Sequence, residues 1–167
     1  NATSVAFKVF PSQPVNFGLG HTLQLGDGVS TQPGGALAFQ INLFNSGTGL
    51  ASLGNVVVNT PWGTNRFVNS ANTIGILGNL TVTAGNYRMT SAHTVKGNII
   101  NNDTLVNTGT LTLADPTNAI TSTNTVAQSI TGSGKFLNAA TGATAGTTNL
   151  TIRNSSVGGV TIGTKLS

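Results

Sequence analysis

The apolar and polar positions along the chain follow the pattern of short β-strands separated by small polar turns. The pattern is clearest in Thr94–Leu113, where apolar and polar residues alternate over Val95–Ile99, Leu105–Val106 and Thr110–Leu113. Asn, Asp and Gly residues separate the three runs, as is typical of turns between half-buried strands. Because strands this short are not stable alone, each of them must stack on others.

The rest of the chain continues this pattern. Alternation is clear in Ser4–Phe10, His21–Leu25 and Ala36–Phe44, and Val56–Val58 is a shorter apolar run. No segment has an apolar period of 3.6 residues over a useful length, and the helix-favouring residues Glu, Lys and Arg are scarce. The sequence therefore predicts an all-β fold.

Short sequence matches recur at one common interval along the chain. Leu105–Asn107 recurs as Phe136–Asn138, and Leu80–Val82 precedes Leu111–Leu113 by the same interval. Leu150–Ile152 follows Leu111–Leu113 at one interval plus an insertion. Further matches at one or two intervals are Thr94–Ile99 with Thr125–Ile130, Thr73–Ile74 with Thr104–Leu105, and Leu43–Thr48 with Leu105–Thr110.

A repeat of about 31 residues with about three strands predicts a β-solenoid, in which stacked coils share one continuous core. About the first 65 residues fit the repeat worst, so we also consider a β-sandwich-like N-terminal part. A β-sandwich of ordinary hairpins is the alternative for the whole chain, because its turn spacing is similar. We expect an N-terminal strand or arm in residues 1–20 and a β domain in residues 21–167, with the clearest repeats in 70–155.

Composition predicts a surface that repels its neighbours weakly. Only 6% of the residues are charged, whereas an ordinary soluble domain carries about 25%. Asn, Thr, Gly, Ser and Ala fill the polar positions, which favours association over monomeric solubility. The net charge is +4, but the seven cations are spread singly along the chain, whereas phosphate binding needs them clustered. We therefore expect no nucleic-acid partner, and we expect no membrane span because no long apolar run is present.

Candidate residues for catalysis or metal binding are few. The chain has no Cys, which excludes disulfides, Cys-ligated zinc and a Cys nucleophile. Its three acids, Asp27, Asp103 and Asp115, fit turn positions rather than the clustered acids of a polysaccharide-active enzyme. His21 and His93 lack the third ligand that a metal site needs. Gly132–Lys135 resembles a phosphate-binding loop but lacks its spacing and the Ser or Thr after the Lys, so we expect no enzyme activity, cofactor or metal.

Three segments from Gly78 onward have a similar cadence, with G-x-L-T-V in the first and N-x-G-T-L-x-L in the second. They are GNLTVTAGNY, GNIINNDTLVNTGTLTL and SITGSGKFLNAA. This part of the chain, about residues 70–155, resembles the passenger domains of bacterial autotransporter adhesins. Its Asn, Thr and Gly bias is similar to that of the rickettsial outer-membrane protein B type. The resemblance implies export, display on the outer surface, and a role in adhesion or in a surface layer.

These features predict a non-enzymatic, extracellular or bacterial cell-surface structural protein. We expect it to assemble with copies of itself through its strand edges into a filament, tube or surface layer. The alternative is a cell-surface adhesin domain that binds glycans or a host protein. The expected subunit contacts lie near the two ends of the chain, at Val5, Phe7, Val9 and Phe10 and at Val160, Ile162 and Leu166.

Overall fold

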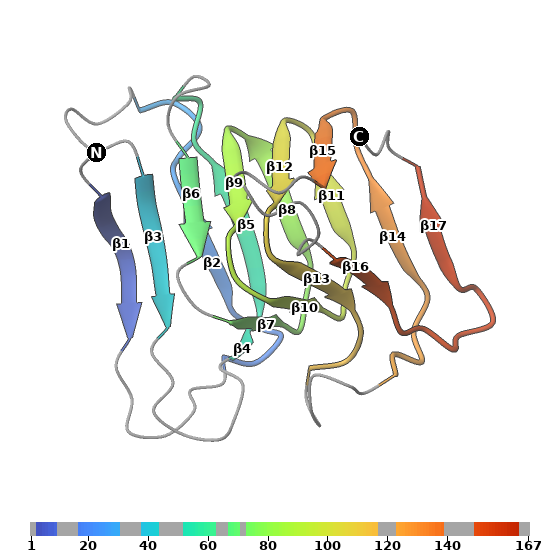
Figure 1. Ribbon diagram of the computed structural model, residues 1–167. Helices are drawn as coiled ribbons and strands as arrows, with labels where there is room; N and C mark the ends of the chain where they lie inside the picture. Colours follow the sequence, from blue (N-terminus) through green and yellow to red (C-terminus); the bar gives the residue numbers. More distant parts are fainter. Residues whose placement is uncertain are drawn as a thin grey trace.

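The described residues of the protein form β-strands and connecting turns, with no helix among them (Figure 1). The computed structural model describes residues 3–9, 17–30, 38–43, 52–62, 67–70, 73–116, 123–138 and 149–163. The prediction of an all-β fold is confirmed for these residues. The strands belong to three sheets, which we call sheets A, B and C.

The three sheets contain five or six strands each. Sheet A consists of β1 (Thr3–Val9), β3 (Ala38–Leu43), β6 (Phe67–Ser70), β9 (Asn86–Met89), β12 (Thr104–Asn107) and β15 (Lys135–Asn138). Sheet B consists of β4 (Ser52–Leu53), β7 (Ile74–Ile76), β10 (His93–Val95), β13 (Thr110–Leu113) and β16 (Asn149–Ile152). Sheet C consists of β2 (Thr22–Leu25), β5 (Asn55–Asn59), β8 (Leu80–Ala84), β11 (Ile99–Asn101), β14 (Gln128–Thr131) and β17 (Val160–Ile162).

The chain visits the three sheets in a fixed order. From β3 onward, consecutive strands belong to sheets A, B and C in turn, so each sheet collects every third strand. We call one such set of three consecutive strands a level. All pairings between the described strands are parallel. A β-sandwich needs antiparallel pairs, so that alternative is wrong for the described part of the chain, its N-terminal strands included.

The strand register confirms part of the predicted repeat. Leu105 pairs with Phe136 and Ile99 pairs with Ile130, each at the predicted interval. Leu111 pairs with Leu150, as one interval plus an insertion predicts. The sequence intervals between these paired residues are long because the chain has extra residues after β13. The interval between Leu111 and Leu150 also contains extra residues after β15. Such insertions lengthen the sequence interval without changing which residues pair.

The prediction of one constant interval is wrong for the central strands. In sheet B, His93 pairs with Ile74 and with Leu111, and both intervals are much shorter than the predicted one. Three other predicted matches are wrong as well, and the match of Thr94–Ile99 with Thr125–Ile130 is right at Ile99 but wrong at Thr94. Leu80–Val82 and Leu111–Leu113 lie in different sheets, as do Ile74 and Leu105. In sheet A, the residue of β3 in the register position of Leu105 is Phe39 rather than Leu43. In sheet B, Thr94 pairs with Thr112 rather than with Thr125.

The stretch Thr94–Leu113 contains one round of the three sheets. The alternation over Val95–Ile99 is divided between two strands, because β10 ends at Val95 and β11 begins at Ile99. Residues 96–98 form the corner that moves the chain from sheet B to sheet C. The chain then passes through β12 in sheet A and returns to sheet B at β13.

Aliphatic and aromatic side chains from all three sheets form a single core cluster. Its largest fully buried members include Ile74 of sheet B, Leu80 and Ile99 of sheet C, and Tyr87 and Phe136 of sheet A. Burying one side chain of this size contributes about 1.5–3 kcal/mol. Because each strand is only two to seven residues long, this shared core supplies the stability that the strands lack individually.

Candidate functional site

The outermost described strands are the edge strands of the three sheets, although Phe17 donates a hydrogen bond to one of them, β4. They are β1 and β15 in sheet A, β4 and β16 in sheet B, and β2 and β17 in sheet C. Figure 1 shows β1 and β17 at opposite ends of the row of strands. The outer side of an edge strand presents backbone N–H and C=O groups that can pair with another chain. These two ends are therefore the first candidates for a functional surface.

Two of these edge strands contain the predicted contact residues. Val5, Phe7 and Val9 lie in β1, whose backbone pairs with β3 of the same chain, so β1 is part of the chain's own sheet A. In β17, Val160 is half-buried and Ile162 is 41% exposed. The two other predicted contacts, Phe10 and Leu166, lie outside the described residues.

The chain segment before β2 also belongs to the N-terminal end. The backbone N–H of Phe17 donates to the carbonyl oxygen of Ser52 in β4 at 2.9 Å, so this segment takes the place of a sheet B strand in the first level. A hollow of about 180 Å³ lies beside it and is lined by residues of this segment and of the two edge strands, namely Phe17, His21, Thr22, Leu23, Leu53 and Gly54. Its lining is largely apolar, which suits an aliphatic side chain better than a charged ligand.

A column of Asn side chains follows the corner between sheets B and C. The side-chain oxygen of Asn55 accepts the backbone N–H of Asn79 at 2.9 Å, and that of Asn79 accepts the N–H of Asn98 at 2.8 Å. The side-chain oxygen of Asn98 in turn accepts the N–H of Ser129 at 2.9 Å. Each amide therefore satisfies a corner N–H of the next level, which would otherwise lack a strand partner.

The sequence contained a signal for this column that our search for a fixed interval missed. A Gly precedes each of the three Asn residues, at Gly54, Gly78 and Gly97, and an aliphatic residue follows each of them. A Cβ on Gly97 would overlap the carbonyl oxygen of Gly78, and a Cβ on Gly78 would overlap the side chain of Asn55. Gly is needed there because the corners of neighbouring levels lie too close for a side chain. The spacing of the Gly-Asn pairs is unequal, which hid their repetition.

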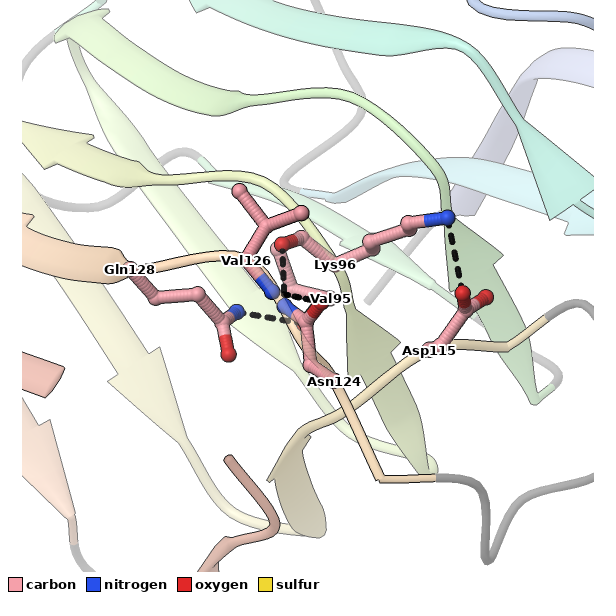
Figure 2. Close-up of polar contacts among 6 residues, drawn as sticks. All are labelled: Val95, Lys96, Asp115, Asn124, Val126 and Gln128. Atoms are coloured by element: carbon pink, nitrogen blue, oxygen red, sulfur yellow. Dashed lines mark hydrogen bonds and ion pairs between the residues drawn. The ribbon is translucent and has the colours of Figure 1, made fainter. Parts of the chain in front are cut away.

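The next level continues this corner with a different set of polar contacts (Figure 2). Lys96 Nζ lies 2.7 Å from Asp115 Oδ2. The side-chain amide of Asn124 donates to the carbonyl oxygen of Lys96 at 2.8 Å, and that of Gln128 donates to the carbonyl oxygen of Val95 at 3.0 Å. Two side-chain amides of one level thus satisfy two backbone carbonyls of the level before.

The last described level repeats this arrangement. Asn154 forms a parallel bridge with Asn124. The side-chain amide of Asn154 donates to the carbonyl oxygen of Val126 at 2.8 Å and to Gln128 Oε1 at 2.9 Å. These polar groups are amides, backbone groups and one ion pair, which can hold adjacent levels together. They do not form a nucleophile–base pair or a pair of free carboxylates.

His93 lies buried in the core and is hydrogen-bonded on both ring nitrogens. Its Nδ1 lies 3.0 Å from the carbonyl oxygen of Ser91, so Nδ1 carries the proton and donates to that oxygen. Its Nε2 then accepts from the hydroxyl of Tyr87 at 3.0 Å. Burial lowers the pKa of His93 to about 4, against an ordinary value of 6.5. The interpretation of His93 as a structural residue agrees with these contacts, although the sequence did not indicate Tyr87 as its partner.

The three carboxylates also have structural partners. Asp27 accepts the backbone N–H groups of Val29 and Ser30 at 2.9 and 2.7 Å and also bonds the Ser30 hydroxyl, and these bonds lower the pKa of Asp27 to about 2. Asp103 accepts the N–H of Gly85 at 2.6 Å. Among the described residues, no group of three or more His, Cys, Asp or Glu side chains is placed to hold a metal ion.

The remaining sequence candidates occupy turns or loops. In Gly132–Lys135, the backbone N–H of Gly134 donates to the carbonyl oxygen of Asn101 at 2.9 Å, and Gly132 has a φ of 115°. Gly132–Gly134 form the turn between β14 and β15, and Lys135 is the first residue of β15. Trp62 lies in the loop after β5 and is half-buried against the core.

Comparisons of the chain with protein-family models, with curated proteins and with solved structures gave no match. Within the described segments, no helix has the length and apolar character needed to cross a membrane.

Proposed function

We propose that the protein is a β-solenoid and that it serves as a structural subunit of a homopolymer outside the cell. The observation that carries this proposal is the pair of open ends. All three sheets are parallel, and each has one edge strand in the first levels and the other in the last level. A second copy can therefore continue all three sheets at once, in the same direction.

The edge strands contain few of the devices that prevent such pairing. Natural edge strands are commonly protected by charged residues, Pro or bulges. The sequences of β2 (TLQL), β16 (NLTI) and β17 (VTI) contain no charge and no Pro, although β15 contains Lys135 and β1 contains Lys8 and a register shift. With only 6% charged residues in the chain, repulsion between copies is weak.

A head-to-tail contact of this kind produces an open filament or tube if its rotation does not close into a ring. The low charge, the Asn- and Thr-rich faces and the resemblance to autotransporter passengers support a setting on a bacterial surface or in the extracellular space. In this proposal the polar corner and the apolar core hold the levels together within one copy. The open edges extend the same arrangement from one copy to the next.

The test is the assembly state of the purified chain, measured by light scattering over a range of concentrations and by negative-stain electron microscopy. We expect ordered polymers whose mass rises with concentration. A monodisperse monomer at all concentrations would contradict the proposal and would favour the adhesin alternative.

A pair of matched variants separates edge pairing from non-specific aggregation. Ile162→Lys places a charge on the edge strand β17, and we expect it to prevent polymer formation. Val126→Lys makes the same change at a residue that is 58% exposed and lies outside the sheet edges, so it should still polymerise. Circular dichroism of both variants checks that the β content is retained. Equal polymerisation of the two variants would exclude a role for the β17 edge.

A further inference from the structure

Aliphatic residues in one register position follow sheet C from its first strand to its last. Each of them pairs with the next across a parallel strand pair, in the order Leu23, Val56, Leu80, Ile99, Ile130 and Ile162. The four inner members are fully buried, each with 0% exposure. The two end members are not, because Leu23 is half-buried and Ile162 is 41% exposed. Among the described strands, the column therefore has no further member beyond Leu23 or beyond Ile162.

An apolar hollow lies beside Leu23, where a further neighbour in the column could pack. Leu23 lines the apolar hollow of about 180 Å³ at the N-terminal end, together with Phe17 and Leu53. Inside the sheet, the corresponding space beside each inner member is occupied by the aliphatic side chain of the adjacent strand. The hollow is thus the place where one more residue of the column would pack. The exposed residue that continues this column is Ile162, at the other end of the molecule.

We propose that copies of this chain join head to tail in one register, with β17 of one copy pairing in parallel with β2 of the next. Ile162 then lies opposite Leu23 of the next copy and fills the hollow beside Phe17. This inference rests on the proposed function, and it specifies which strands meet, in which direction and at which residues. The occupant of the hollow is a second copy because only the outer side of β17 continues the register, the direction and the residue type of the column.

A two-fold contact between identical ends does not have these properties. Two β17 strands related by a two-fold axis would pair antiparallel, unlike the pairs within the molecule. They would also leave the hollow at each far end empty, and assembly would end at a dimer. In the head-to-tail contact, Ile162 of one copy packs against Leu23 of the next. The two outer ends of the growing assembly remain the same as those of a single copy, so further copies can add.

A pair of engineered cysteines tests the register directly. If Ile162 lies opposite Leu23, then Thr161 lies opposite Thr22, and both Thr residues are exposed. Neighbouring strands lie about 4.8 Å apart, a separation that a disulfide can span. Within one copy the two positions are separated by β5, β8, β11 and β14, which is about 24 Å and too far for a bond. The natural chain has no Cys, so a disulfide in the variant Thr22→Cys/Thr161→Cys must join two copies.

We expect this double variant, under oxidising conditions, to give a ladder of covalent oligomers on a non-reducing gel that a reductant converts to monomer. The single variants should give mainly monomer. The control Thr22→Cys/Val126→Cys keeps one edge position and moves the other away from the edges, and it should give no ladder. Covalent dimers from either single variant would show a two-fold contact and would overturn the proposal.

The outcomes separate this proposal from the proposed function. If light scattering shows polymer but the double-cysteine variant gives no ladder, assembly is real and this interface is wrong. If no condition gives polymer, the proposed function is wrong and this interface is excluded with it.

A second measurement uses charges instead of a disulfide. Ile162→Lys and Leu23→Lys should each remain monomeric alone. An equimolar mixture should stop at dimers, because the unchanged Leu23 of the first variant can still pair with the unchanged Ile162 of the second. The other end of each copy carries the Lys and cannot pair. A mixture that stays monomeric while the unchanged chain polymerises would contradict the pairing.

Discussion

The stability of the protein should depend on pH through His93. In the folded protein the pKa of His93 is lowered to about 4 because its ring is fully buried, and its ordinary value of 6.5 applies to the unfolded chain. Between these two values the unfolded chain binds a proton at this residue that the folded protein does not bind. The free energy of unfolding therefore falls as the pH falls from about 6.5 to about 4 and is fully retained above that window.

The size of the effect follows from the two pKa values. At about 1.4 kcal/mol for each pH step of one, the difference between 6.5 and about 4 corresponds to about 3 kcal/mol once both states are protonated. At pH 4.5, where the folded protein is partly protonated, the loss is about 2–3 kcal/mol. Because a typical domain is stable by only about 5–15 kcal/mol, this loss is large enough to measure.

The comparison protein is the double variant Tyr87→Phe/His93→Leu. Leu suits this position because the register neighbours of His93 in sheet B are Ile74 and Leu111. Phe at position 87 removes the hydroxyl that would lose its bond to the histidine. Urea unfolding at pH 7.5 and 4.5, at concentrations where light scattering shows monomer, gives the free energy of unfolding of both proteins.

We expect the unchanged protein to lose about 2–3 kcal/mol more than the double variant between these two pH values. All ionisable groups other than His93 and Tyr87 are the same in both proteins, so their contributions cancel in the difference. The single variant Tyr87→Phe, which keeps the histidine, should retain most of the pH dependence. An equal loss in the unchanged protein and the double variant would refute the assignment of this pH dependence to His93.

Three further predictions concern the corner between sheets B and C, each measured as the free energy of unfolding in urea. Gly97→Ala should lower the free energy of unfolding by more than about 2 kcal/mol, because its Cβ would overlap a backbone carbonyl of the level before. The control Gly20→Ala should lower it much less, because a Cβ there meets nothing within 4 Å. Similar losses of stability in the two variants would contradict the close approach at Gly97. Asn79→Ala should cost about 1–3 kcal/mol because it removes the acceptor of a corner N–H, and a neutral result would show that water replaces it. Lys96→Met should cost about 1 kcal/mol or less, since the side chains of the ion pair with Asp115 are 29% and 20% exposed; the cost should shrink as NaCl is raised, and a cost independent of salt would point to packing instead.

The sequence by itself determined the class of the fold and the positions of its turns. Alternation with a period of two shows which residues share one face of a strand. For this reason strands of the structure coincide with or overlap three predicted segments, Ala36–Phe44, Val56–Val58 and Thr110–Leu113. The first of these segments starts and ends beyond the described residues of β3. The sequence also placed Asp103 in a turn, because small polar residues favour turns irrespective of tertiary context.

Only the tertiary structure decided which strands pair. Period-two alternation carries no information about the partner of a strand, and short Thr-Leu or Leu-Thr matches are too common in this composition to select one. Leu111 shows why a single period failed, because its partner on one side, His93, is much closer in sequence than its partner on the other side, Leu150. Insertions at the corners change the number of residues per level, while the stacking of buried side chains keeps the register.

The same reason applies to Thr94–Leu113 and to the candidate interface. The sequence identified three short alternating runs in this stretch, but not that four strands lie within it or that three sheets share its core. Likewise, the alternation around Ile162 predicted an edge strand without indicating its counterpart. The counterpart, Leu23, became visible only when the strands were stacked, because packing between levels is a property of neighbours in space rather than in sequence.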